Sequence, residues 1–172
     1  MRTTACLMLA ALLLTLSGRT VHAGDPANGP EVQLNADNAG PRELEDLTRQ
    51  SLARDYARAW STMAQALDQN RPDALGNDFV GFALDNLTQR VASQQQNGLR
   101  TRIVDHGHKA VIVFYSPEGS SVELRDTAQL EIQVLQGSSV VHSENVTMHY
   151  ISVMTPTEVR WKVRVLEALP ET

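Results

Sequence analysis

The alternating segment from Ser121 to Leu135 is the feature that most constrains what this chain can fold into. Apolar side chains occupy one parity of the segment and polar side chains occupy the other. A period of two places successive side chains on opposite faces of a β-strand, so one face would lie in a core and the other in water. At about 3.3 Å per residue the strand would extend roughly 45 Å. Such a length favours a central, curved strand of an antiparallel sheet.

Asp126 breaks this pattern, because its carboxylate falls on the apolar parity. If the register holds, the carboxylate points into the core, where desolvation would raise its pKa and could make it a general acid or base. Two structural alternatives stay open: a β-bulge could turn Asp126 to solvent, or an arginine such as Arg125 or Arg90 could pair with it. Asp126 is therefore the first candidate for a catalytic residue.

Residues 1–23 have the pattern of an export signal. Arg2 supplies a positive charge, an apolar run follows, and Val21 and Ala23 occupy the −3 and −1 positions of a cleavage site. The apolar run is shorter than the roughly 20 residues of a membrane span. We therefore expect cleavage, no stable membrane insertion afterwards, and an exported protein, either periplasmic or secreted. An uncleaved anchor is the alternative.

Cleavage would determine the cysteine content and the charge of the mature chain. Cys6 is the single cysteine, so the mature chain could form no disulfide, thiolate metal site or cysteine nucleophile. The segment also holds two arginines and no acids, so its loss changes the formal net charge from −5 to −7. An acidic domain argues against nucleic acid as a partner.

The mature chain divides into a leader and one domain. Residues 24–40 are rich in Gly, Pro, Asn and Asp and hold few large apolar groups, which predicts a disordered leader. Residues 41–172 have the length of a single domain. Apolar stripes predict a long helix over residues 41–68 and a second helix over residues 79–96, with a short turn at 72–77. The strands predicted after them are 100–105, 108–115, 121–135, 139–154 and 158–169.

This order predicts an α+β domain in which N-terminal helices pack on a curved antiparallel sheet of four to five strands. The order, together with R-W-K-V-R-V at residues 160–165, resembles the nuclear-transport-factor-2-like superfamily of cystatin-like, cone-shaped domains over about residues 44–169. A-R-A-W-S-T-M-A-Q-A-L at residues 57–67 and the closing W-K-V are similar to the SnoaL/Tim44-like and plastid-division-type members. The resemblance implies a hollow between helix and sheet, a possible homodimer through sheet faces, and, in the latter members, mainly interaction roles.

The strand over residues 139–154 offers further polar groups. His142 and Tyr150 share a parity, and if that parity faces inward they would join Asp126 as the lining of a small-molecule pocket. The opposite parity, with Asn145 and His149, is equally polar. A solvated edge strand is therefore the alternative to a pocket.

Two other polar groupings have structural explanations as good as functional ones. Asp105, His106 and His108, with a third histidine at 142 or 149, could supply zinc ligands, but Gly107 between them indicates a polar hairpin turn. Arg160, Lys162 and Arg164 form a basic row for an acidic partner surface, or for cross-strand pairing with Glu123 and Glu131. We expect no cofactor and no metal.

Two functions are compatible with these patterns. The first is an exported, non-catalytic domain that binds a protein partner or a small ligand. The second is a small enzyme, an isomerase, dehydratase or hydrolase, with Asp126 as acid or base and His142 or Tyr150 assisting. The first hypothesis is preferred, because the sequence offers no convergent catalytic set.

Overall fold

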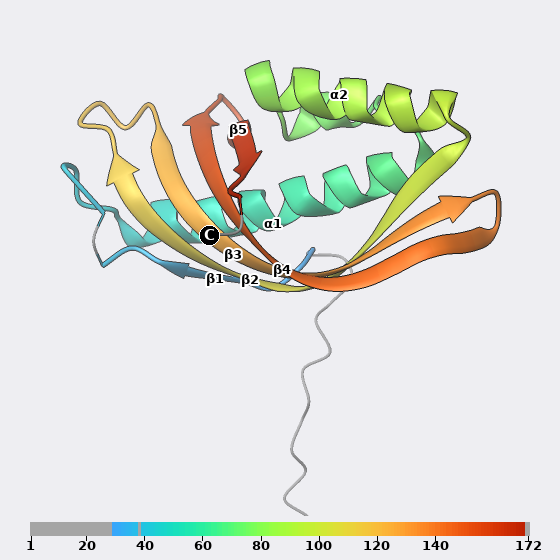
Figure 1. The fold of residues 1–172 in the computed structure, drawn as a ribbon. Coiled ribbons are helices and arrows are strands. Elements are labelled where there is room, and N and C mark those ends of the chain that lie inside the picture. Colours follow the sequence, from blue (N-terminus) through green and yellow to red (C-terminus); the bar gives the residue numbers. More distant parts are fainter. Residues whose placement is uncertain (1–28, 38, 171–172) are drawn as a thin grey trace, which may run out of the picture.

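The structure is a computed structural model that describes residues 29–37 and 39–170. Helices cover one face of an open, strongly curved sheet, and the chain is therefore an α+β domain (Figure 1). The predicted signal segment and residues 24–28 lie outside the described residues. No helix in the described part of the chain is long and apolar enough to cross a bilayer.

The sheet contains five strands in the spatial order β1-β2-β3-β4-β5. Their bounds are β1 Val32–Asn35, β2 Leu99–Tyr115, β3 Val122–Gln136, β4 Ser139–Pro156 and β5 Trp161–Ala168. Neighbours from β2 to β5 pair antiparallel, whereas β1 runs parallel to β2. The sheet is thus mixed, and β3 is the central strand that the alternating segment predicts.

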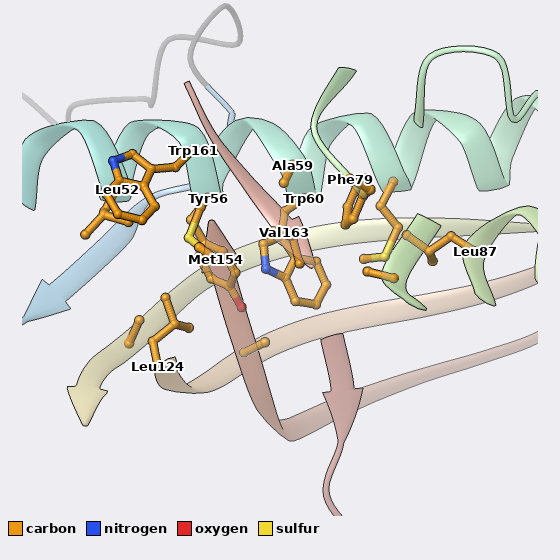
Figure 2. Packing of buried hydrophobic residues seen from close by; sticks show 14 of the residues in the cluster. Leu52, Tyr56, Ala59, Trp60, Phe79, Leu87, Leu124, Met154, Trp161 and Val163 are labelled. Atoms are coloured by element: carbon orange, nitrogen blue, oxygen red, sulfur yellow. The ribbon is translucent and has the colours of Figure 1, made fainter. Parts of the chain in front are cut away.

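Two helices and one short turn precede β2. They are α1 Asp46–Gln69, the 3-10 turn η1 Leu75–Asn77, and α2 Gly81–Gln96. The stripe of α1 packs against the inner face of the sheet, and Figure 2 shows Tyr56 and Trp60 pointing from this helix toward the strands. Opposite them, Leu124 of β3 and Met154 of β4 are fully buried. This helix–sheet interface is the hydrophobic core.

The start of the fold differs from the prediction. Residues 32–35, which we expected in a disordered leader, form β1, so that expectation is wrong for this segment. Val32 and Leu34 pair along β2 and pack against the core, so even two apolar side chains bury enough surface here. The helix predicted from residue 41 begins instead at Asp46, because the backbone around Pro41 pairs with Tyr115 of β2.

The hairpin predicted at residues 106–107 is also wrong, because β2 continues through it as one strand. Asp105 lies opposite Leu130 of β3 and His108 lies opposite Ala128, so His106 and Gly107 share a single partner position. Two residues against one is a β-bulge. Gly107 has φ of 120°, a value that residues with a side chain rarely adopt. The two strands predicted around the turn are therefore one.

Candidate functional site

The bulge in β2 determines which polar side chains meet in the core. Asp105 and His108 are three positions apart and would face opposite sides of a regular strand. The extra residue in the bulge restores the same side, so both face the inner side of the sheet, where Asp126 of β3 lies. Asp105 also accepts a hydrogen bond from the Gly107 N–H at 2.9 Å, which fixes the carboxylate beside the bulge.

His108 lies between two carboxylates. Its Nδ1 is 2.6 Å from Oδ2 of Asp126, and its Nε2 is 2.8 Å from Oδ2 of Asp105. The ionised carboxylate oxygens only accept hydrogen bonds, so both ring nitrogens act as donors when the ring is a doubly protonated imidazolium. Such charge-assisted bonds are shorter and stronger than neutral ones.

Helix α1 covers this cluster with two aromatic side chains. The Tyr56 hydroxyl donates a hydrogen bond of 2.9 Å to Oδ2 of Asp126. The Trp60 ring lies against the His108 ring, with centroids 4.5 Å apart. The side chains of His108 and Asp126 are completely buried, whereas the Asp105 carboxylate is 15% exposed.

The pKa values of the cluster follow from this geometry. Burial lowers the pKa of His108, but the hydrogen bonds and negative charges of Asp105 and Asp126 outweigh it and raise the pKa to about 9. Burial, followed by the charge of Asp126, raises the pKa of Tyr56 well above its usual value. His108 is therefore a buried cation at neutral pH, and Tyr56 is a neutral hydrogen-bond donor.

The side chains of His108, Asp126 and Tyr56 lie below the surface of the part of the chain that the structure describes. A cleft of about 180 Å³ lies at the bulge, but it is lined by neither Asp126 nor Tyr56. His108 borders this cleft, yet its side chain has no exposed surface, so it presents its backbone there. General acid–base catalysis requires a group within hydrogen-bonding reach of the substrate. The arrangement instead joins α1, β2 and β3 through buried polar contacts.

Of the three residues that we predicted to line a pocket, the structure places Tyr150 beside Asp126 and His142 far from both. Tyr150 lies directly opposite Asp126 in the β3–β4 register, but its hydroxyl donates to Sδ of Met148 at 3.2 Å. His142 is eight positions further along β4, roughly 26 Å away at the rise of a strand, and its side chain is 58% exposed. Asp126, His142 and Tyr150 therefore do not converge on one site.

Neither structural alternative for Asp126 occurs: the residue is buried and not turned to solvent, and its partners are His108 and Tyr56 instead of an arginine. Arg125 points to the outer face of β3, because it is exposed whereas the residues on either side of it in the strand are buried. The relevant signal in the sequence was Gly107 inside a run of strand-forming residues, which is typical of a bulge as well as of a turn. Interpreted as a bulge, it would have placed His108 on the same face as Asp126.

The histidines considered as zinc ligands and the basic row at residues 160–164 do not form a binding site with one another in the described residues. His106 is exposed on the bulge, and His149 is 3.1 Å from the Thr127 hydroxyl. Within residues 29–37 and 39–170, no three His, Cys, Asp or Glu side chains are placed to hold a metal ion. The pairing predicted for the basic row is wrong: Arg160 binds Asp78, and Lys162 donates to the Gly76 carbonyl.

A second buried network holds β5 against α1. Asp55 accepts hydrogen bonds from Arg58 at 2.9 Å and from the Trp161 backbone N–H at 2.9 Å. Asp78 accepts from Arg58 at 3.1 Å and from Arg160 at 3.3 Å. Both carboxylates are buried, and Arg58 bridges them. Each acid has the partners that a buried charge needs, so this network is structural.

Comparison with known proteins defines the fold and not the activity. No family model matches the chain, and no curated protein sequence matches it. Among solved structures, the chain is similar to the intermembrane space region of the chloroplast protein ARC6, with a TM-score of 0.60 and 16% sequence identity. The likeness covers 76% of this chain and 100% of that chain. The shared property is the arrangement of helices and sheet.

Proposed function

We propose that this chain is an exported, non-catalytic interaction domain of the nuclear-transport-factor-2-like type, which binds a protein partner or a small ligand. The observation that carries the proposal is the sealed state of the His108 cluster. His108 bonds to Asp126 and Asp105 through its two ring nitrogens, Tyr56 bonds to Asp126, and the aromatic side chains of α1 cover His108 and Asp126, whose side chains have no exposed surface. Oδ1 of Asp126 has no hydrogen-bond partner and is buried, out of reach of a substrate. A domain with such a core acts through its surface.

The outer face of the sheet is the surface that favours a protein partner. Both helices lie on the inner face, so no helix or strand of residues 29–37 and 39–170 covers the outer face (Figure 1). Phe114 and Val111 of β2 are 39% and 36% exposed there. In register, Phe114 lies beside Glu123 and Val111 lies beside Arg125. Exposed aromatic and aliphatic groups among charges are typical of protein interfaces.

Export and membership of the cone-shaped superfamily are part of the same proposal. The export signal in residues 1–23 supports the first. The helix–turn–helix–strand order and the curvature of the sheet around α1 support the second. The similarity to the ARC6 region, at 16% identity, supports the fold alone. The location and the role of the ARC6 region are properties of that protein.

The enzyme alternative requires the cluster to open. Asp126 would have to leave His108 and Tyr56 to reach a substrate, and His142 lies too far along β4 to assist. Of the expected catalytic residues, only Tyr150 is beside Asp126. The interaction proposal needs no such rearrangement.

Site-specific photo-crosslinking in the native host tests the proposal. A photoreactive phenylalanine analogue would replace Phe114 on the outer face or, as a matched control, Phe82 of α2, which is 71% exposed. We expect a discrete covalent adduct with another protein from position 114 and none from position 82. Adducts from both positions alike, or from neither, would contradict binding through the outer face.

A further inference from the structure

The edge of β4 is unpaired along more than half of the strand. β5 pairs with β4 from Tyr150 to Pro156, and the Leu169 N–H donates to the His149 carbonyl at 2.7 Å. In the described part of the chain, residues 139–148 of β4 have β3 on one side and no strand on the other. Figure 1 shows this half of β4 and its hairpin with β3 extending away from β5.

The hydrogen bond to His149 identifies the backbone groups that face this open edge. The carbonyl of His149 points toward the β5 side, and backbone groups alternate in direction along a strand. The pairing of residues 142–149 with β3 is regular, so Ser143, Asn145 and Thr147 also direct their N–H and C=O groups to that side. This row is a template for one more strand.

The β4 edge lacks the protection that the free edges of β1 and β2 have. The uncovered edge of β2, residues 99–107, carries Arg100 and Arg102, and β1 presents an edge of only four residues. Charged side chains and short edges discourage strand addition. Residues 139–149 contain no Lys, Arg or Pro, and Glu144 is their single formal charge at neutral pH. Val140 and Val141 are also 49% and 56% exposed there.

We propose that this edge pairs antiparallel with the same edge of a second copy, about a two-fold axis at Ser143. Because β5 occupies the edge from His149 onward, the two copies overlap only within residues 139–148. Backbone groups meet when the odd-numbered residues of one copy face odd-numbered residues of the other. A two-fold axis at Ser143 satisfies both conditions.

Hydrogen-bonding and apolar complementarity favour this register. It places Glu144 of one copy opposite His142 of the other, twice, whereas an axis at residue 144 would oppose the two acids. Both side chains are at least half exposed and lie on one face, 3.7 Å apart within a single copy. In this register the Asn145–Val146 segment of the second copy also covers Val140 and Val141 of the first. The bulge at Val141 ends the regular ladder and keeps it short.

Sedimentation of the purified protein over a concentration series tests this inference. We expect the average mass to rise from one copy to two copies as the concentration increases. Asn145→Pro removes an N–H that faces the open edge and no bond to β3, and Thr147→Lys places a charge at the edge. Both variants should stay monomeric, with the far-UV circular dichroism of the wild type.

The matched control is Gln129→Lys, which adds the same charge on β3 directly opposite Thr147, one strand away from the edge. This variant should dimerise like the wild type. Hydrogen exchange of Ser143 and Asn145 amides should also slow as concentration rises. A wild type of constant monomeric mass would overturn the inference, and the edge would then be open to a strand of a different protein. A dimer that persists in Asn145→Pro would also overturn it, because the interface would lie elsewhere.

Discussion

The Nδ1 atom of His108 lies 2.6 Å from Oδ2 of Asp126, and neither side chain has any exposed surface. This contact joins β2 to β3 directly under α1, and Asp105 completes it from the other side of the imidazole ring. A buried cation with two carboxylate partners is costly to disturb, because removal of one partner leaves the other charge unpaired in the core. The cluster is therefore a structural centre of the domain.

Neutralising Asp126 should destabilise the protein. Asp126→Asn removes the negative charge next to the His108 cation and weakens the acceptor of the Tyr56 hydroxyl. We expect the free energy of unfolding, measured by urea denaturation at neutral pH, to fall by about 3 kcal/mol. Asp46→Asn, at an exposed pair with Arg49, is the control and should cost less than about 1 kcal/mol. An increase in stability for Asp126→Asn would mean that the acid is not paired.

The stability of the protein should decrease in mildly alkaline solution. Because the pKa of His108 is raised from 6.5 to about 9, the folded state holds a proton that the unfolded state releases. The contribution is complete below pH 6.5 and is lost as the pH rises through about 9. Its size is on the order of 3 kcal/mol. Urea denaturation across this range measures it.

The matched variant for this pH dependence is His108→Gln. It keeps a polar side chain of similar reach but cannot titrate, so its stability should be lower at neutral pH and should vary less between pH 6.5 and pH 9. If the wild type and His108→Gln lose stability in parallel over this range, another group is responsible for the pH dependence.

The bulge should depend on Gly107. A Cβ at this position would meet only the Glu31 carbonyl oxygen, at an ordinary 3.5 Å, so the cost of Gly107→Ala arises from φ of 120°. We expect a loss of about 1–3 kcal/mol. Gly76→Ala, where no atom lies within 4 Å and φ is ordinary, should change stability by less than about 0.5 kcal/mol. Equal effects of the two substitutions on the thermal midpoint would contradict this account of the bulge.

The second network makes its own prediction. Asp78→Ala leaves Arg58 and Arg160 without a shared acceptor and removes the partner of the Thr62 hydroxyl. We expect a loss of about 3 kcal/mol, measured by urea denaturation. Arg160→Ala should cost clearly less, because Arg160 is partly exposed and Arg58 still pairs with Asp78. A larger loss for Arg160→Ala than for Asp78→Ala would be inconsistent with this network.

The elements with strong periodicity could be predicted from the sequence. The alternation of β3 gave its position, its buried face and the inward direction of Asp126. The stripe of α1 gave a helix with Tyr56 and Trp60 in the core. These patterns are long enough that tertiary packing does not overrule them.

The predictions that were wrong concern features that depend on contacts between residues far apart in the sequence. β1 is only four residues long, and it is ordered by its pairing with β2. Gly107 is compatible with a turn or a bulge, and only the register against β3 distinguishes them. The choice between a turn and a bulge also decides whether His108 can be the partner of Asp126. A hairpin tip at residues 106–107 would have placed His108 away from the core. The sequence therefore predicted the buried position of Asp126 but not that of its partner His108.

The protonation state of the His108 ring tests the central claim most directly. Nitrogen-detected NMR of the purified protein should show two ring N–H signals from His108 at neutral pH, both in slow exchange with water. The imidazolium should persist well above pH 6.5 and titrate near pH 9. A neutral ring at neutral pH, or ring protons in fast exchange with solvent, would show that the cluster is open and would contradict a sealed structural role.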